Sequence, residues 1–136
     1  MALVAQGWSL AARLDLTRPL RLLLAATLTT AVDFVIDPLA ANQLGYWRWQ
    51  HGGLYHDIPA TNFAGWLVTS LAAVLLFSRW LEPTFWARAV GLSITVFFSL
   101  TAAAHGPALA ALVGFALCAL QALLTFRARP PQPARG

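Results

Sequence analysis

The chain has 136 residues, of which 59% are hydrophobic and only 10% are charged, and its mean hydropathy is +0.65, whereas soluble domains carry about 25% charged residues. The formal net charge of +4 comes from arginines at the ends of apolar runs, so nothing gathers them into a basic face for nucleic acid. The composition therefore excludes an ordinary soluble domain and predicts an integral membrane protein.

The first twelve residues, MALVAQGWSLAA, lack the basic leading region and the clear cleavage site of a secretory signal. We therefore expect them to be retained. Two placements are open: the segment lies on the membrane surface, or it is the end of a helix that begins earlier in a longer protein.

Four apolar stretches are long enough to cross a hydrocarbon core, which takes about 20 residues of helix. Lipid offers no partner for backbone polar groups, and no stretch alternates with the period of two that a barrel needs, so each span is predicted to be helical. The predicted fold is all-α, with one helical membrane domain over residues 1–127 and a disordered, basic, proline-rich tail over residues 128–136. The predicted spans are residues 20–45, 58–77, 85–104 and 108–126.

The arginines predict the orientation through the positive-inside rule. Eight of them precede the first span, flank the second connection or follow the fourth span, and Arg48 alone lies on the opposite side. Both termini are therefore predicted to be cytoplasmic, in a multi-pass protein of the cytoplasmic membrane. The connection between the first two spans is predicted to face outward.

The first span carries two carboxylates, in the segment AVDFVIDPLA. Asp33 and Asp37 are four residues apart and so share one helical face. Carboxylates inside a membrane are costly and usually face a bundle interior or a water-filled cavity. Pro38 has no N–H and disfavours the helical conformation at Asp37, so a kink with free carbonyl groups is predicted beside them.

Two tryptophans follow in the segment LGYWRW. Tryptophan is common at membrane interfaces, where it anchors a helix. Trp47 and Trp49 also lie next to the end of the helix that carries the carboxylates, so their π faces could meet a ligand or a cation.

The next connection ends in HDIPATNFAGW, residues 56–66, which holds more polar groups than a turn requires. Pro59 is predicted to begin the second span and Asn62 to lie in its first turn. Gly65 is expected to allow a close approach of another helix, and Trp66 lies one turn beyond Asn62 on the same face.

These groups are predicted to converge on one shallow intramembrane site formed by Asp33, Asp37 and Asn62, with His105 within reach from the third span. A metal site in this region is not favoured, because its ligands would lack a standard spacing and the outer hydrogen bonds that such a site needs. Those ligands would be His51, His56, Asp57 and His105.

The run from Asp33 to Trp66 resembles the membrane family of carotenoid biosynthesis that includes bisanhydrobacterioruberin hydratase and the γ-carotene and lycopene 1,2-hydratases. The family pattern is an aspartate pair closing on Asp-Pro, then Gly-x-Trp-x-Trp, Tyr-x-Gly-Ile-Pro and Asn-Phe-x-Gly-Trp. The matching residues here are Asp33, Asp37 and Pro38; Gly45, Trp47 and Trp49; Tyr55, Ile58 and Pro59; and Asn62, Phe63, Gly65 and Trp66.

Two residues depart from this pattern, because Asp57 stands where the family usually has glycine and His56 where an aromatic residue is common. Family members generally have a further amino-terminal block of helices. The chain therefore looks like the carboxyl-terminal half of that architecture.

The resemblance implies hydration of the terminal double bond of an acyclic carotenoid, without a metal or a redox cofactor. The residues suit this chemistry, because two carboxylates one turn apart in a poorly solvated site favour sharing a proton, so that one serves as acid and the other as base. The catalytic candidates are Asp33, Asp37 and Asn62. The candidates for substrate binding are Trp47, Trp49, Tyr55, His56, Asp57 and Trp66.

Two other classes of function stay open. A carotenoid- or lipid-binding accessory subunit would keep its pigment without the carboxylates, and a small proton or ion pathway would explain buried carboxylates but not the spacing of the tryptophans. Membrane lipid surrounds the chain in every case. Because four helices are few for enclosing a polyene, we expect a homo-oligomer or a separate helical membrane subunit.

Overall fold

The structure, a computed structural model, describes residues 1–126, and its elements are helices. Within these residues the only extended pairing is an isolated bridge between Tyr55 and Ile58, so the prediction of an all-α fold is confirmed. The predicted tail, residues 128–136, lies outside the described residues. In chain order the helices are α1 (Ala2–Ala11), α2 (Arg18–Ala31), α3 (Asp33–Pro38), η1 (Leu39–Gln43), α4 (Ala60–Phe77), α5 (Phe85–His105) and α6 (Ala108–Phe126).

Four helical runs are long and apolar enough to cross a membrane, as predicted. The first is the combined run of α2, α3 and η1, Arg18–Gln43, which begins and ends two residues before the predicted span. The second begins at Ala60 because Pro59, with an extended backbone, is the residue before its first turn. The other two are α5 and α6.

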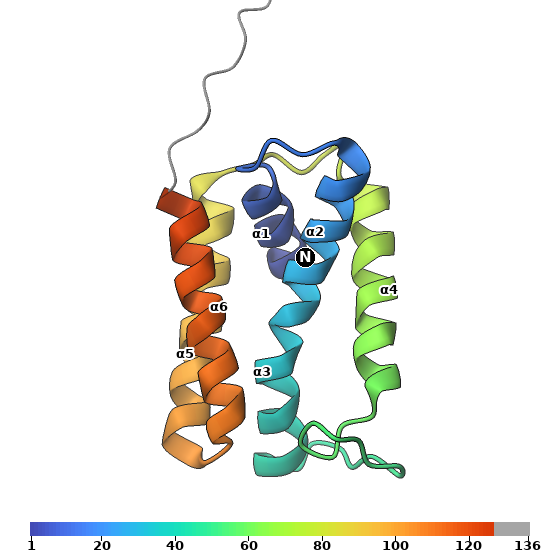
Figure 1. Cartoon of the computed structure of the whole chain (residues 1–136), viewed down its shortest axis with the longest axis vertical. Helices are drawn as coiled ribbons and strands as arrows, with labels where there is room; N and C mark the ends of the chain where they lie inside the picture. Colours follow the sequence, from blue (N-terminus) through green and yellow to red (C-terminus); the bar gives the residue numbers. More distant parts are fainter. Residues whose placement is uncertain (127–136) are drawn as a thin grey trace, which may run out of the picture.

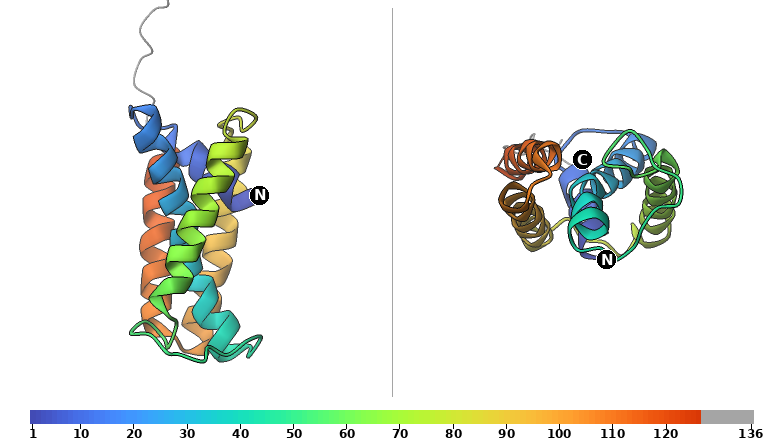
Figure 2. Two further views of the ribbon diagram at one scale, coloured as in Figure 1. Left: turned by 90° about the vertical axis from the view of Figure 1, so that its right-hand side faces the viewer. Right: turned by 90° about the horizontal axis from the view of Figure 1, so that it is seen from below.

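The combined run lies in the middle of the bundle, with α4 on one side and the antiparallel α5–α6 hairpin on the other (Figures 1 and 2). Gly106, at φ 123°, makes the tight turn of the hairpin in a conformation that favours glycine. Figure 1 shows this turn and the connection from η1 to α4 at the same end of the bundle. The cytoplasmic placement of the opposite end stays a prediction.

Helix α1 packs inside the bundle, which contradicts one of the two placements left open, the one on the membrane surface. The Gln6 side chain is 2% exposed and donates a hydrogen bond of 2.7 Å to Gln121 of α6. The fully buried Ser9 donates one of 2.9 Å to the carbonyl of Thr84 and accepts one of 2.8 Å from Arg88. These polar side chains find their partners in other helices, so they do not mark a face turned to water.

Gly7 and Gly65 differ in whether another helix packs closely against them. A Cβ atom at Gly7 would collide with the backbone carbonyl of Ala25 and lie 2.6 Å from the hydroxyl of Thr29, so glycine lets α1 and α2 meet closely. Gly65 is exposed on α4 and a Cβ atom there would meet nothing within 4 Å. The expectation that Gly65 permits close helix packing was therefore wrong.

Replacement of Gly7 by alanine should push α1 away from α2 and lower the free energy of unfolding by about 1–3 kcal/mol, the usual cost of overpacking. The matched control is Gly65→Ala, which should leave stability unchanged or raise it by up to about 1 kcal/mol through helix propensity. Thermal unfolding in detergent, followed by circular dichroism, measures both. A Gly7→Ala protein as stable as the Gly65→Ala protein would contradict the close contact.

Candidate functional site

The site begins with a change of winding in the combined helical run. Pro38 has no N–H, so the carbonyl of Phe34 loses its partner in the helix. The hydroxyl of Tyr55 donates a hydrogen bond of 2.8 Å to this carbonyl, and after Pro38 the helix widens to a π turn in which Leu44 donates to the carbonyl of Leu39 at 2.9 Å. The carbonyl of Phe34 therefore has no partner within the helix, as predicted. Tyr55 of the connecting loop donates a hydrogen bond to it instead.

Three aromatic rings fasten the loop to two helices. Phe34 of α3 and Phe63 of α4 stack with centroids 4.0 Å apart and planes 9° apart. The ring of Tyr55 packs edge-on against both, at 5.4 Å from Phe34 and 5.9 Å from Phe63. Phe34 follows Asp33 in the chain and Phe63 follows Asn62, so this stack fixes how far apart the two polar residues lie.

Asn62 joins the two carboxylates. Its amide nitrogen donates to Oδ2 of Asp37 at 2.6 Å and to Oδ2 of Asp33 at 3.2 Å. Asp37 is only 2% exposed. The structure therefore brings together the three residues that were predicted to form the centre of the site.

A cavity of about 420 Å³, which we call the carboxylate cavity, lies beside this cluster and is lined by all three polar residues. A second cavity of about 540 Å³, the loop cavity, lies toward the connection and shares Trp47, Arg48 and Trp49 with the first. Asp57 lines the loop cavity but not the carboxylate cavity. The remaining residues of the carboxylate cavity are Ile36, Trp47, Arg48, Trp49 and Trp66.

The two departures from the family pattern form a tight turn. His56 and Asp57 have φ values of 49° and 59°, and the N–H of Ile58 donates to the carbonyl of Tyr55 at 2.9 Å, as in a type I′ turn. The amide of Asn42 donates to the carbonyl of His56 at 2.8 Å, which ties the turn to η1. Burial raises the pKa of the Tyr55 phenol, so this group stays a neutral donor to Phe34.

Not every predicted residue reaches the cavities. Tyr55 and His56 support the loop and line neither cavity, while His105 is exposed at the end of α5 and also lines neither. The sequence reasoning missed Arg48 and Ile36 as lining residues and Phe34 as a support. Two signals could have revealed them, because Arg48 is the one arginine predicted for its side of the membrane and Ile36 lies one turn from Asp33.

The fold and the site together define a helical membrane protein with a bridged carboxylate pair beside an aromatic cavity. The family described as "Carotenoid biosynthesis protein" matches residues 1–127, and the chain belongs to this family.

Among curated proteins, the chain is similar to the bisanhydrobacterioruberin hydratase of Haloarcula japonica, with 43% identity over 56 residues. The aligned segment is 40% of this chain and 18% of that protein. The chain therefore covers less than a fifth of the curated relative that it matches. No solved structure matches it.

Replacement of Asp57 by glycine should raise the free energy of unfolding by up to about 1 kcal/mol, because only glycine adopts this left-handed conformation without cost. The matched control is Asp57→Ala, which removes the same carboxylate but keeps the Cβ atom and should bring no gain. Thermal unfolding of both variants in detergent measures the difference. Equal stability of the glycine and alanine variants would show that the backbone at Asp57 is not strained.

Proposed function

We propose that this chain provides the catalytic residues for adding water to the terminal double bond of an acyclic carotenoid, in an acid-catalysed reaction that needs no cofactor. The observation that carries the proposal is the Asn62 amide bridging Asp33 and Asp37 beside an aromatic cavity. The match to a carotenoid-biosynthesis family and the similarity to the hydratase of Haloarcula japonica support the same chemistry.

The geometry supports different roles for the two carboxylates. The Asn62 amide makes its shorter bond to Asp37, and an N–H donor stabilises a carboxylate that is charged. Two negative charges so close in a poorly solvated site repel each other, so the pair favours holding one proton. Asp33 is then the acid, which carries that proton, and Asp37 is the base.

The reaction follows in two steps. Asp33 transfers its proton to the less substituted carbon of the double bond, so a C–H bond forms, the π bond breaks and a tertiary carbocation results. A water molecule held by Asp37 and Asn62 then adds to the cation, a C–O bond forms, and the released proton returns to the aspartate pair. Trp47, Trp49 and Trp66 line the cavity, and their π faces would stabilise the cation.

The proposal includes a partner that completes the walls of the site. Trp47, Trp49 and Trp66 line the carboxylate cavity but are 42%, 36% and 47% exposed, so the cavity is only partly enclosed. A second copy of the chain or a separate helical membrane protein in the cytoplasmic membrane would cover it. Hydration of the carotenoid is therefore measured in two settings: with the chain expressed alone, and with the chain expressed together with membrane proteins encoded beside it.

In cells that accumulate lycopene, Asp33→Asn and Asp37→Asn should each lower formation of the product that is heavier by one water, by at least about 100-fold, because an amide cannot serve as the acid or the base. Mass spectrometry of the extracted pigments measures the product, and blotting of the membrane fraction checks insertion.

The matched controls are Asp15→Asn, an exposed aspartate in the connection before α2, and Trp80→Phe, an exposed aromatic residue outside the site. Both should retain normal formation of the product. Undiminished hydration by the two site variants would remove the acid–base roles. Retained pigment with no hydration, even with the neighbouring membrane proteins present, would favour an accessory binding subunit.

A further inference from the structure

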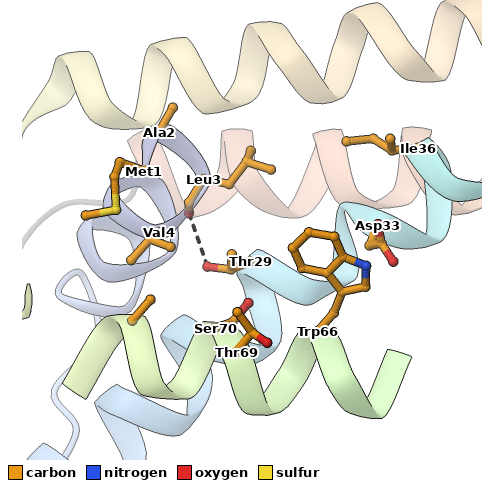
Figure 3. A pocket seen from close by; sticks show the side chains of 11 residues that line it. Met1, Ala2, Leu3, Val4, Thr29, Asp33, Ile36, Trp66, Thr69 and Ser70 are labelled. Atoms are coloured by element: carbon orange, nitrogen blue, oxygen red, sulfur yellow. Dashed lines mark hydrogen bonds between the residues drawn. The ribbon is translucent and has the colours of Figure 1, made fainter. Parts of the chain in front are cut away.

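The carboxylate cavity continues into a second cavity on the side away from the loop. We call this second cavity, of about 360 Å³, the inner groove. The two share Asp33, Ile36 and Trp66, so they meet at the acid. From there the inner groove runs between α1, α2 and α4, and Figure 3 shows the indole of Trp66 beside Asp33 at this junction. Its further lining residues include Thr29, Thr69, Ser70 and Ala73.

The inner groove has the direction of the helices. Ala73 lies seven residues beyond Trp66 on α4, which places the far end about 10 Å from the indole. The first turn of α1 forms one wall, because the Thr29 hydroxyl lies 3.1 Å from the carbonyl of Leu3. Thr69 is exposed and Ala73 is partly exposed on α4, so the groove opens toward the surrounding lipid along this helix.

The lining of the inner groove suits an apolar chain. The hydroxyl of Thr29 donates to the carbonyl of Ala25 at 2.8 Å and that of Thr30 lies 3.4 Å from the hydroxyl of Ser70, so these polar groups already have protein partners. No arginine or lysine side chain is among the residues that line the groove. The aromatic face of Trp66 offers a surface on which a conjugated chain can stack.

We propose that the inner groove binds the conjugated chain of a linear polyene, so that the polyene enters from the lipid along α4 and its terminal double bond stops at Asp33. The inference rests on the proposed function for the identity of the ligand. It follows from the continuity of the two cavities at Asp33 and from the mostly apolar lining beyond Trp66. Ala73 and Thr69 then determine whether the chain can enter.

The test measures binding separately from turnover. The full chain is purified from membranes of cells that accumulate lycopene, in an Asp33→Asn background that removes the acid, and the bound polyene is measured by its visible absorbance per mole of protein. Ala73→Phe fills the far end of the groove and should lower the retained polyene at least about tenfold. Its matched control is Ala72→Phe, on the neighbouring exposed position of α4, which should retain the normal amount.

A second pair of variants tests whether a loss of binding reflects a folding defect. Thr69→Phe narrows the groove from its exposed edge and should also lower binding, whereas Val68→Phe, at a position 67% exposed, should not. Equal retention within both pairs, or no polyene on the Asp33→Asn protein, would overturn the inference. So would a loss of bound phospholipid instead of polyene in the groove variants, measured by mass spectrometry. Selective loss of polyene in these pairs, together with no hydration by the unaltered chain in the lycopene assay, would support the groove and refute the proposed function.

Discussion

Two carboxyl groups can lie together inside an apolar helix bundle only if their charge is shared or neutralised, because lipid and packed side chains solvate charge poorly. Asn62 stabilises the charge that the pair shares, because its amide donates hydrogen bonds to both Asp33 and Asp37. The donor stands on α4 and the acceptors on α3, so the two helices must hold a fixed spacing. Much of the surrounding structure serves that spacing.

The aromatic stack and the loop hold the polar cluster in place. The stack of Phe34 on Phe63 sets the distance between α3 and α4 one residue away from the polar cluster. Tyr55 packs on both rings and satisfies the carbonyl that Pro38 leaves free. A proline that weakens the helix therefore also creates the acceptor that fastens the loop, and the loop carries Trp47 and Trp49, which line the carboxylate cavity.

The sequence predicted the helices well, because a membrane imposes their length and apolar composition. It also predicted the meeting of Asp33, Asp37 and Asn62, since helical spacing and a short connection leave few other arrangements. It could not predict the place of α1, because the hydrogen-bond partners of Gln6 and Ser9 lie 115 and 75 residues away in the sequence. The same limit applies to Gly65, whose neighbours depend on how α4 packs and not on local spacing.

The roles of the loop residues lay beyond the sequence for a related reason. Tyr55 and His56 were predicted to bind substrate, yet they support the loop, whereas Arg48 lines both cavities. Side-chain direction in an irregular loop follows from dihedral angles such as the positive φ of His56 and Asp57. No periodic pattern encodes these angles.

The central claim is that the aspartate pair holds one proton on Asp33. Infrared spectroscopy of the protein in hydrated membranes at neutral pH tests it most directly, through the carbonyl band of a protonated carboxyl group. The account predicts such a band in the unaltered protein and in Asp15→Asn, and its loss in Asp33→Asn. Absence of the band from the unaltered protein, or a band that persists in Asp33→Asn, would contradict the account.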